Sequence, residues 1–194
     1  MNPLILKIVY MAFWVAIPII RYPFAQRQKA NQISVDRKSR AEKTLLYTVP
    51  VGTMLFPLLY VFTSLLSLAD YVPPRWVPIL GMILTVPTLW LFYRSHKDLG
   101  LNWSVSLEIR EGHTLVDGGV YRYIRHPMYS ALWLFGVVQA CLLPNWIAGP
   151  SGLVTFGLLY FFRVGKEETM MQQQLGEQYT AYMRRTKRLI PFVI

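Results

Sequence analysis

The sequence predicts an all-α integral membrane protein with about five transmembrane helices. Apolar residues make up 54% of the 194 residues, and the mean hydropathy is positive, which is unusual for a soluble domain of this size. The apolar residues form long runs, and the Lys and Arg residues gather in three clusters between them. Membrane proteins arrange helices and loops in this way. The length fits one domain.

The first predicted span covers residues 4–20, and Lys7 is its one charged residue. This run lacks a basic start and a small-residue cleavage pattern, so we predict a retained membrane helix rather than a signal peptide. Residues 21–43 follow as a polar, strongly basic loop.

Two more spans are predicted before residue 94, at residues 44–69 and 76–93. The first of these is long enough to cross the bilayer even when tilted. Residues 70–75 between them form a short turn, because the pair Pro73-Pro74 stops a helix. Three residues are expected to bend the helix at 44–69, namely Pro50, Gly52 and Pro57.

Residues 94–127 are polar and contain four glycines, which predicts loops and short pieces of structure rather than one helix. Pro127 suits the first position of a helix, where its missing N–H costs nothing. Two apolar segments follow, at residues 128–143 and 146–162, with Pro144-Asn145 between them.

These two segments predict a tight helical hairpin. Each has 16 or 17 residues, near the lower limit for crossing a bilayer, so the sequence leaves open whether the hairpin crosses fully. Small residues would let its helices approach closely, namely Gly136, Ala140, Gly149, Gly152 and Gly157. We expect the second helix to leave the membrane after residue 162 and to continue to about Arg185. A tail suited to an anionic membrane surface follows it.

The distribution of Lys and Arg predicts the orientation in the membrane. Residues 21–43 hold seven, residues 94–127 hold five and the chain after residue 162 holds six, which places 18 of the 20 on one side. Basic loops stay in the cytosol. We therefore predict five crossings with the amino end outside and the carboxyl end in the cytosol.

Several function classes have no support. The net charge of +10 is spread over loops between apolar runs, without a basic arm or nucleic-acid motif, so nucleic-acid binding is not expected. The single cysteine, Cys141, cannot form an internal disulfide and is best explained as a packing residue. The three histidines lack the HxxxH and HExxH spacings, so no metal site is predicted.

Candidate chemistry lies where the last apolar run ends. Arg163 and Glu167 are four residues apart and share a helix face, which on its own is equally consistent with a structural ion pair. Glu168 adds a second carboxylate, and Lys166 and Arg163 are the nearby cations along the chain. A doubled carboxylate beneath a bilayer suits a cationic ligand.

The turn before the hairpin is the second candidate. His126 precedes Pro127 at a helix start, where the helix dipole favours an anion, although a simple capping role explains it equally well. Tyr121, Tyr123 and Tyr129 suit interfacial anchors, and they could also stack on a purine or face a cation.

Several motifs in the second half of the chain together resemble the isoprenylcysteine carboxyl methyltransferase family, in a prokaryotic-type member. They read, in order, His113-Thr114-Leu115-Val116, Gly119-Val120-Tyr121-Arg122-Tyr123, Arg125-His126-Pro127-Met128-Tyr129, Arg163 with Glu167-Glu168, Gly176-Glu177-Gln178-Tyr179-Thr180-Ala181-Tyr182, and Pro191-Phe192. The resemblance covers roughly residues 94–194, and the order and spacing of the motifs match. Residues 1–93 add membrane character without a motif.

The resemblance implies an S-adenosylmethionine-dependent carboxyl O-methyltransferase that acts on a lipophilic, prenylcysteine-like substrate entering from the bilayer. It implies a cofactor site lined by His113, Thr114, Leu115, Val116, Tyr121, His126, Pro127, Met128, Tyr129 and Glu167. The distribution of Lys and Arg predicts that this site lies on the cytosolic side. By the same matching Arg163 is the catalytic residue nearest the substrate carboxylate. Residues 1–93 would be the three amino-terminal helices of one methyltransferase domain, and residues 94–194 its catalytic region.

Three alternatives remain open. A phospholipid amine N-methyltransferase would need a base, and Arg163 facing the nucleophile is unsuited to that chemistry. An NADPH-dependent sterol-type reductase would need more basic residues in its pocket, and Lys97, Arg122 and Arg125 are available. A membrane scaffold would leave the ordered motifs unexplained. The natural acceptor and the oligomeric state do not follow from the sequence.

Overall fold

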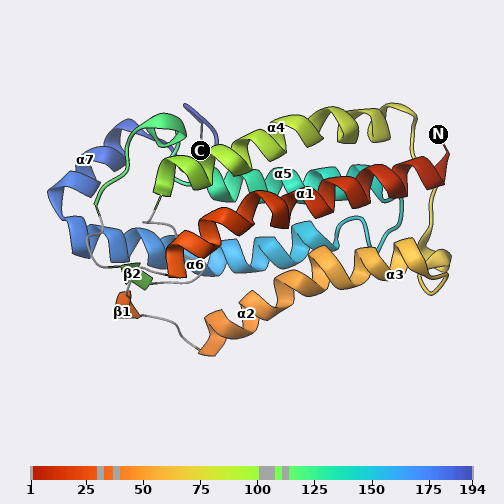
Figure 1. The fold of residues 1–194 in the computed structure, drawn as a ribbon, viewed down its shortest axis with the longest axis horizontal. Coiled ribbons are helices and arrows are strands. Elements are labelled where there is room, and N and C mark those ends of the chain that lie inside the picture. The colour runs from red at the N-terminus through yellow and green to blue at the C-terminus, as the bar shows by residue number, and fades with distance from the viewer. Residues whose placement is uncertain (1, 30–32, 37–39, 101–107, 111–113, 194) are drawn as a thin grey trace.

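The computed structural model describes residues 2–29, 33–36, 40–100, 108–110 and 114–193. Within them the fold is an elongated helical bundle, in which five long helical segments run along the long axis (Figure 1). These segments are α1 (Pro3–Lys29), the segment from α2 (Arg40–Pro50) to α3 (Phe56–Phe62), α4 (Trp76–Leu99), α5 (Pro127–Leu142) and α6 (Ser151–Leu175).

The membrane prediction is confirmed. Three helical segments are long and apolar enough to cross a bilayer, namely Pro3–Arg27, Arg40–Phe62 and Trp76–Leu99, and Pro127–Leu142 is a shorter apolar helix. The chain is an integral membrane protein. The five crossings and their orientation remain predictions.

Two predicted loops are partly helical. The first helix continues past residue 20 to Lys29, and α4 continues past residue 93 to Leu99. In both places the apolar run ends without a helix-breaking pair of residues. The backbone hydrogen bonds of the helix therefore continue past the end of the apolar run. The second span, by contrast, was predicted to end at residue 69, which is too far along the chain. Its helix ends at Phe62, and Thr63 is extended, with φ −136° and ψ 170°.

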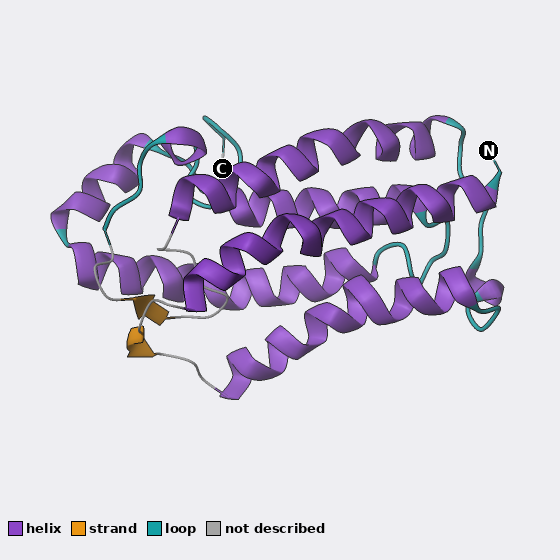
Figure 2. Ribbon diagram, in the orientation of Figure 1, coloured by secondary structure: helices purple, strands orange, loops and turns teal. Residues whose placement is uncertain are grey.

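One element was not predicted, a two-stranded antiparallel ribbon of β1 (Ile33–Asp36) and β2 (Glu108–Arg110). Figure 2 shows it as the strand component of a fold that is otherwise helix and loop in its described residues. The ribbon joins two polar segments that are far apart in sequence. It lies near the end of the bundle formed by η4 (Gly119–Arg122), α7 (Glu177–Arg185) and the carboxyl tail (Figure 1), which we call the basic end.

A π-helical segment, η1 (Val51–Leu55), lies between α2 and α3, at the residues that were predicted to bend the second span. Gly52 crosses α6 here so closely that a Cβ atom would lie 2.4 Å from the carbonyl oxygen of Ser151. Side chains of other helices donate to carbonyls of this segment: Gln139 to Gly52 at 3.0 Å and Trp14 to Thr53 at 3.0 Å. These bonds meet the demand that backbone groups inside a bilayer be paired.

The hairpin of α5 and α6 is confirmed as closely packed. Cβ atoms at Gly136 and Gly152 would lie 2.7 Å from Leu153 and from Gln139 respectively. On its other side α5 packs on α1, where the rings of Phe13 and Phe135 stack at 5.0 Å. These contacts place the start of α5 and the end of α6 together at the basic end.

The prediction that the last helix runs unbroken to about Arg185 was wrong. It ends at Leu175, and α7 starts after Gly176, whose φ of +55° is a left-handed conformation that glycine adopts readily. The break lets α7 fold back toward η4 and α5 (Figure 1). There the hydroxyl of Tyr182 donates to the carbonyl of Tyr121 at 2.6 Å.

Candidate functional site

The turn that begins α5 is held by the carboxyl tail. The backbone N–H groups of Arg125 and His126 donate to the carbonyls of Lys187 and Arg188, at 2.7 and 2.9 Å. Pro127 is the first residue of α5, as predicted. The segment after α7 therefore packs against this turn and fixes its position.

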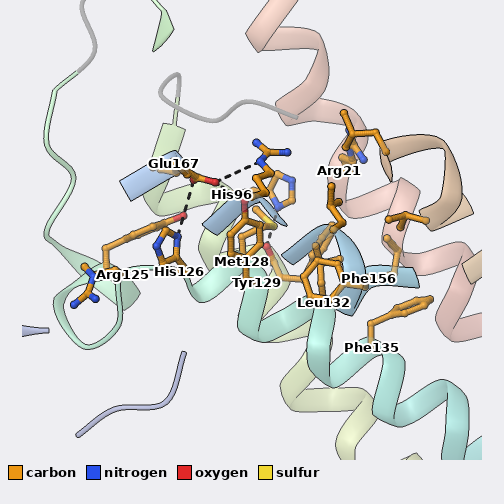
Figure 3. Close-up of a pocket in the computed structure, with 18 of the residues that line it drawn as sticks. Arg21, His96, Arg125, His126, Met128, Tyr129, Leu132, Phe135, Phe156 and Glu167 are labelled. Carbon is orange, nitrogen blue, oxygen red and sulfur yellow. Dashed lines mark hydrogen bonds and ion pairs between the residues drawn. The ribbon is translucent and has the colours of Figure 1, made fainter. Parts of the chain in front are cut away.

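Arg163 and Glu167 lie at the end of α6 that faces this turn. Arg163 Nε is 3.4 Å from Glu167 Oε2, so the predicted pair on one helix face is confirmed. The hydroxyl of Tyr129 donates to Glu167, and His126 Nδ1 lies 4.0 Å from Glu167 Oε1. Figure 3 shows Glu167 beside His126, with dashed lines to its partners.

Glu168 points to a different set of partners. Its carboxylate accepts hydrogen bonds from Arg125 Nε at 3.1 Å and Arg188 Nη2 at 2.5 Å, and it lies 3.3 Å from His126 Nε2. Burial disfavours its charge, but the hydrogen bonds of His126 and Arg188 outweigh that effect and lower the pKa of Glu168 to about 2. Glu168 thus ties α5, α6 and the tail together.

This arrangement corrects the expectation that Glu167 and Glu168 form a doubled carboxylate with Lys166 and Arg163 as its nearby cations. Adjacent residues of a helix diverge by about 100°, so the two side chains face different surroundings. Glu168 forms ion pairs with Arg125 and Arg188 instead, which are distant from it in sequence. Glu167 is the carboxylate that remains at the cavity.

A cavity of about 680 Å³ opens beside Arg163 and Glu167. That volume lies within the roughly 300–1,000 Å³ that is usual for ligand sites. Most of the predicted site residues line it, namely Thr114, Leu115, Val116, Tyr121, His126, Met128, Tyr129, Arg163 and Glu167. Pro127 is buried at the start of α5 and is not among the lining residues. His113 lies outside the described residues.

The lining residues change character along the cavity. Charged and hydroxyl-bearing side chains come from the start of α5 and from α6, whereas α1 and the segment from α2 to η1 supply mainly apolar ones. Leu132 and Phe135 of α5 and Phe156 of α6 extend the apolar part away from His126 and Glu167 (Figure 3). The cavity therefore suits ligands that combine a polar group with a long apolar group.

The sequence did not predict several residues around the cavity. Arg21 of α1 and His96 of α4 line it, and Figure 3 shows both. Glu42 of α2 is fully buried, and its Oε1 lies 3.8 Å from Arg163 Nη1. These residues belong to the first half of the chain, where no motif marks them. A polar residue within a predicted span or at its end was the available signal.

Fold and cavity define a class: a multi-pass helical membrane protein with a ligand site that is polar at one end and apolar at the other. The family model for the isoprenylcysteine carboxyl methyltransferase family matches residues 79–173. Over these residues, just under half of the chain, the sequence is similar to that family, as its motifs predicted.

Individual proteins with names from the same family are also similar to this chain. The chain is 29% identical over 120 residues to human protein-S-isoprenylcysteine O-methyltransferase, covering 61% of this chain and 42% of the human protein. It is 26% identical over 157 residues to protein-S-isoprenylcysteine O-methyltransferase B of Arabidopsis thaliana, covering 75% of this chain and 80% of that protein. It thus aligns with less than half of the human relative's length.

The fold also matches a solved structure, that of the eukaryotic intramembrane Ras methyltransferase isoprenylcysteine carboxyl methyltransferase. The TM-score is 0.54 at 22% identity, and the match covers 95% of this chain and 62% of the other. At that identity the likeness supports the fold, and it extends to the amino-terminal helices, where the family model does not reach.

Proposed function

We propose that this protein is a membrane methyltransferase that uses S-adenosylmethionine to methylate the carboxylate of a lipophilic, prenylcysteine-like acceptor. The observation that carries the proposal is the cavity, since motifs from three separate segments meet there beside an apolar region. The similarity to the family supports the class of reaction. We place the cavity on the cytosolic side, in line with the distribution of Lys and Arg.

The residues present fit the methyl donor. Glu167 supplies a negative charge for its ammonium or ribose, and Thr114–Val116, Tyr121, His126 and Met128 would form the rest of its site. When bound, S-adenosylmethionine supplies a methyl group on a positively charged sulfur atom. We infer that Glu167 favours this cation over the neutral product.

Arg163 is the residue we assign to the acceptor. Its guanidinium is always charged and can bind a carboxylate through two N–H groups. The acceptor carboxylate is already ionised at neutral pH, so this chemistry needs no general base. Arg163 would hold one carboxylate oxygen in line with the methyl group. Its burial, with 6% of the residue exposed, keeps bulk water from competing.

The apolar part of the cavity is the proposed place for the acceptor's lipid group. α1 and the segment from α2 to η1 form one side of that part, and they also carry exposed apolar residues outside the cavity lining, such as Ile19 and Val51. An acceptor already dissolved in the bilayer would enter from this side. The reaction therefore has to take place at membrane level.

The test is a labelled-methyl assay with prenylcysteine analogues, lipid amines and small lipophilic acids, together with calorimetry of donor binding. We expect transfer to the carboxylates and binding of S-adenosylmethionine. Arg163→Ala should reduce transfer at least 100-fold and largely spare donor affinity, whereas Glu167→Ala should weaken donor binding. Transfer to amines, or binding of NADPH in place of S-adenosylmethionine, would contradict the proposal.

A further inference from the structure

Glu42 is buried where a carboxylate is costly to bury. It lies in the first turn of α2, and among the residues of that helix it alone is buried, with none of its surface exposed. Its neighbours Ala41 and Lys43 are both exposed. An ionised carboxylate loses several kcal/mol of hydration on burial and persists there only with a compensating partner.

Arg163 is a compensating cation for Glu42. Glu42 Oε1 lies 3.8 Å from Arg163 Nη1, while Glu167 Oε2 lies 3.4 Å from Arg163 Nε. Two carboxylates thus contact different nitrogen atoms of one guanidinium. One of them comes from the same helix as Arg163, and the other comes from α2. Contacts at two positions restrain both the location and the plane of the guanidinium.

The face of α2 that carries Glu42 also forms the cavity wall. Leu46 and Val49 lie four and seven residues after Glu42, so the three side chains share one helix face. Both apolar residues line the cavity. The part of the wall that is suited to an acceptor's lipid group and the carboxylate that touches Arg163 therefore belong to one helical segment, Arg40–Pro50.

We propose that Glu42 is a positioning residue that holds Arg163 in the orientation required for the acceptor carboxylate. This inference rests on the proposed function. An arginine side chain carries about 2 kcal/mol of rotamer entropy. Restraining it before the acceptor arrives reduces what is lost on binding and keeps the reacting oxygen in line. Glu42 acts through Arg163 and does not itself touch the acceptor.

The test is Glu42→Gln, which keeps the shape of the side chain and removes its charge. We expect kcat/KM for the acceptor to fall at least tenfold, with the Kd of S-adenosylmethionine changed less than threefold. The matched control is Glu177→Gln, which changes an exposed carboxylate in the first turn of α7. It should leave both quantities unchanged.

A purely structural tie between α2 and α6 gives a different result. In that case Glu42→Gln would lower Tm but leave the acceptor kinetics of the folded protein as in the wild type, which would overturn the inference. A lower acceptor KM would also overturn it, because Glu42 would then be a competitor of the acceptor. If Glu42→Gln does not fold, Glu42→Asp retains the charge on a shorter side chain. We expect it to lower acceptor kcat/KM several-fold with donor Kd preserved, and wild-type kinetics would overturn the inference.

Failure of the proposed function is distinguishable from failure of this inference. If the wild-type protein transfers methyl groups to none of the carboxylate acceptors, the proposed function fails. If the wild type is active on them and Glu42→Gln matches it in acceptor kcat/KM, only the role of Glu42 fails.

Discussion

Two adjacent glutamates, Glu167 and Glu168, have different tasks at the end of α6. Glu167 faces the cavity, with Arg163 and Tyr129 as partners. Glu168 is 3% exposed and is surrounded by Arg125, His126 and Arg188. A buried carboxylate with this set of partners stabilises the fold in its ionised form, because protonation would leave cations without their counter-charge.

We predict that the contribution of Glu168 to stability is lost in acid. Its folded pKa of about 2 is below the ordinary value of 4.5. The contribution is therefore fully present above about pH 4.5 and is lost as the pH falls toward 2. The difference in pKa corresponds to about 3 kcal/mol. Glu168→Gln should lower Tm at pH 7, and the gap from the wild type should narrow steadily below pH 4.5.

Thermal unfolding in detergent between pH 7 and pH 3 measures this effect. Glu177→Gln serves as the control, because it changes an exposed carboxylate at the same end of the molecule. If the difference in Tm between Glu168→Gln and the wild type stays constant with pH, the contribution of Glu168 to stability does not depend on its ionisation.

At the scale of elements, the crossing of η1 over α6 determines how closely the second span packs on the hairpin. A Cβ atom at Gly52 would lie 2.2 Å from Thr155 Oγ1 and 2.4 Å from the Ser151 carbonyl oxygen. The second of these atoms is backbone and cannot rotate away. The same crossing forms part of the apolar cavity wall through Pro50 and Thr53.

Gly52→Ala should therefore destabilise the protein by about 1–3 kcal/mol, the usual cost of overpacking. Thermal unfolding in detergent would measure the change as a lower Tm. Gly165→Ala is the matched control, since a Cβ atom there has no neighbour within 4 Å among the described residues. It should be neutral or stabilising by up to about 1 kcal/mol, because alanine favours a helix. Equal Tm values for the two variants would argue against a tight crossing.

At the scale of the whole molecule, the basic segments meet at one end. α7, the carboxyl tail and the ribbon of β1 and β2 lie near the basic end, whereas the amino terminus and the turn after α3 lie at the opposite end (Figure 1). Asp70 and Asn145 pair across that opposite end, where Asn145 Nδ2 donates to Asp70 Oδ1 at 2.7 Å. This arrangement supports an orientation with the basic end in the cytosol.

Single-cysteine labelling tests that orientation. In a Cys141→Ala background, Arg75→Cys places an exposed thiol in the turn before α4, and Gln174→Cys places one near the end of α6. A membrane-impermeant maleimide applied to intact cells should label the first variant and should label the second only after permeabilisation. The reverse pattern would overturn the predicted orientation.

The class of fold and the resemblance to the family could both be predicted from the amino-acid sequence alone. Apolar runs and basic loops are local properties of the chain, and they identify helices and membrane character without knowledge of packing. The ordered motifs predicted the resemblance to the family, and nine of the eleven candidate site residues line the cavity. The i, i+4 pairing of Arg163 and Glu167 followed from helix geometry alone.

The distant residues that complete the site are known only from the way the helices pack. Gly176 reverses the chain so that the tail bonds to the turn before α5 and Arg188 reaches Glu168. Glu42 meets Arg163 because α2 packs against α6. Hydrophobic periodicity indicates which face of a helix is buried but not which helix packs against it, so contacts between segments that are distant in sequence leave no local pattern. The partners of Arg163 and Glu168 therefore depend on how the helices pack.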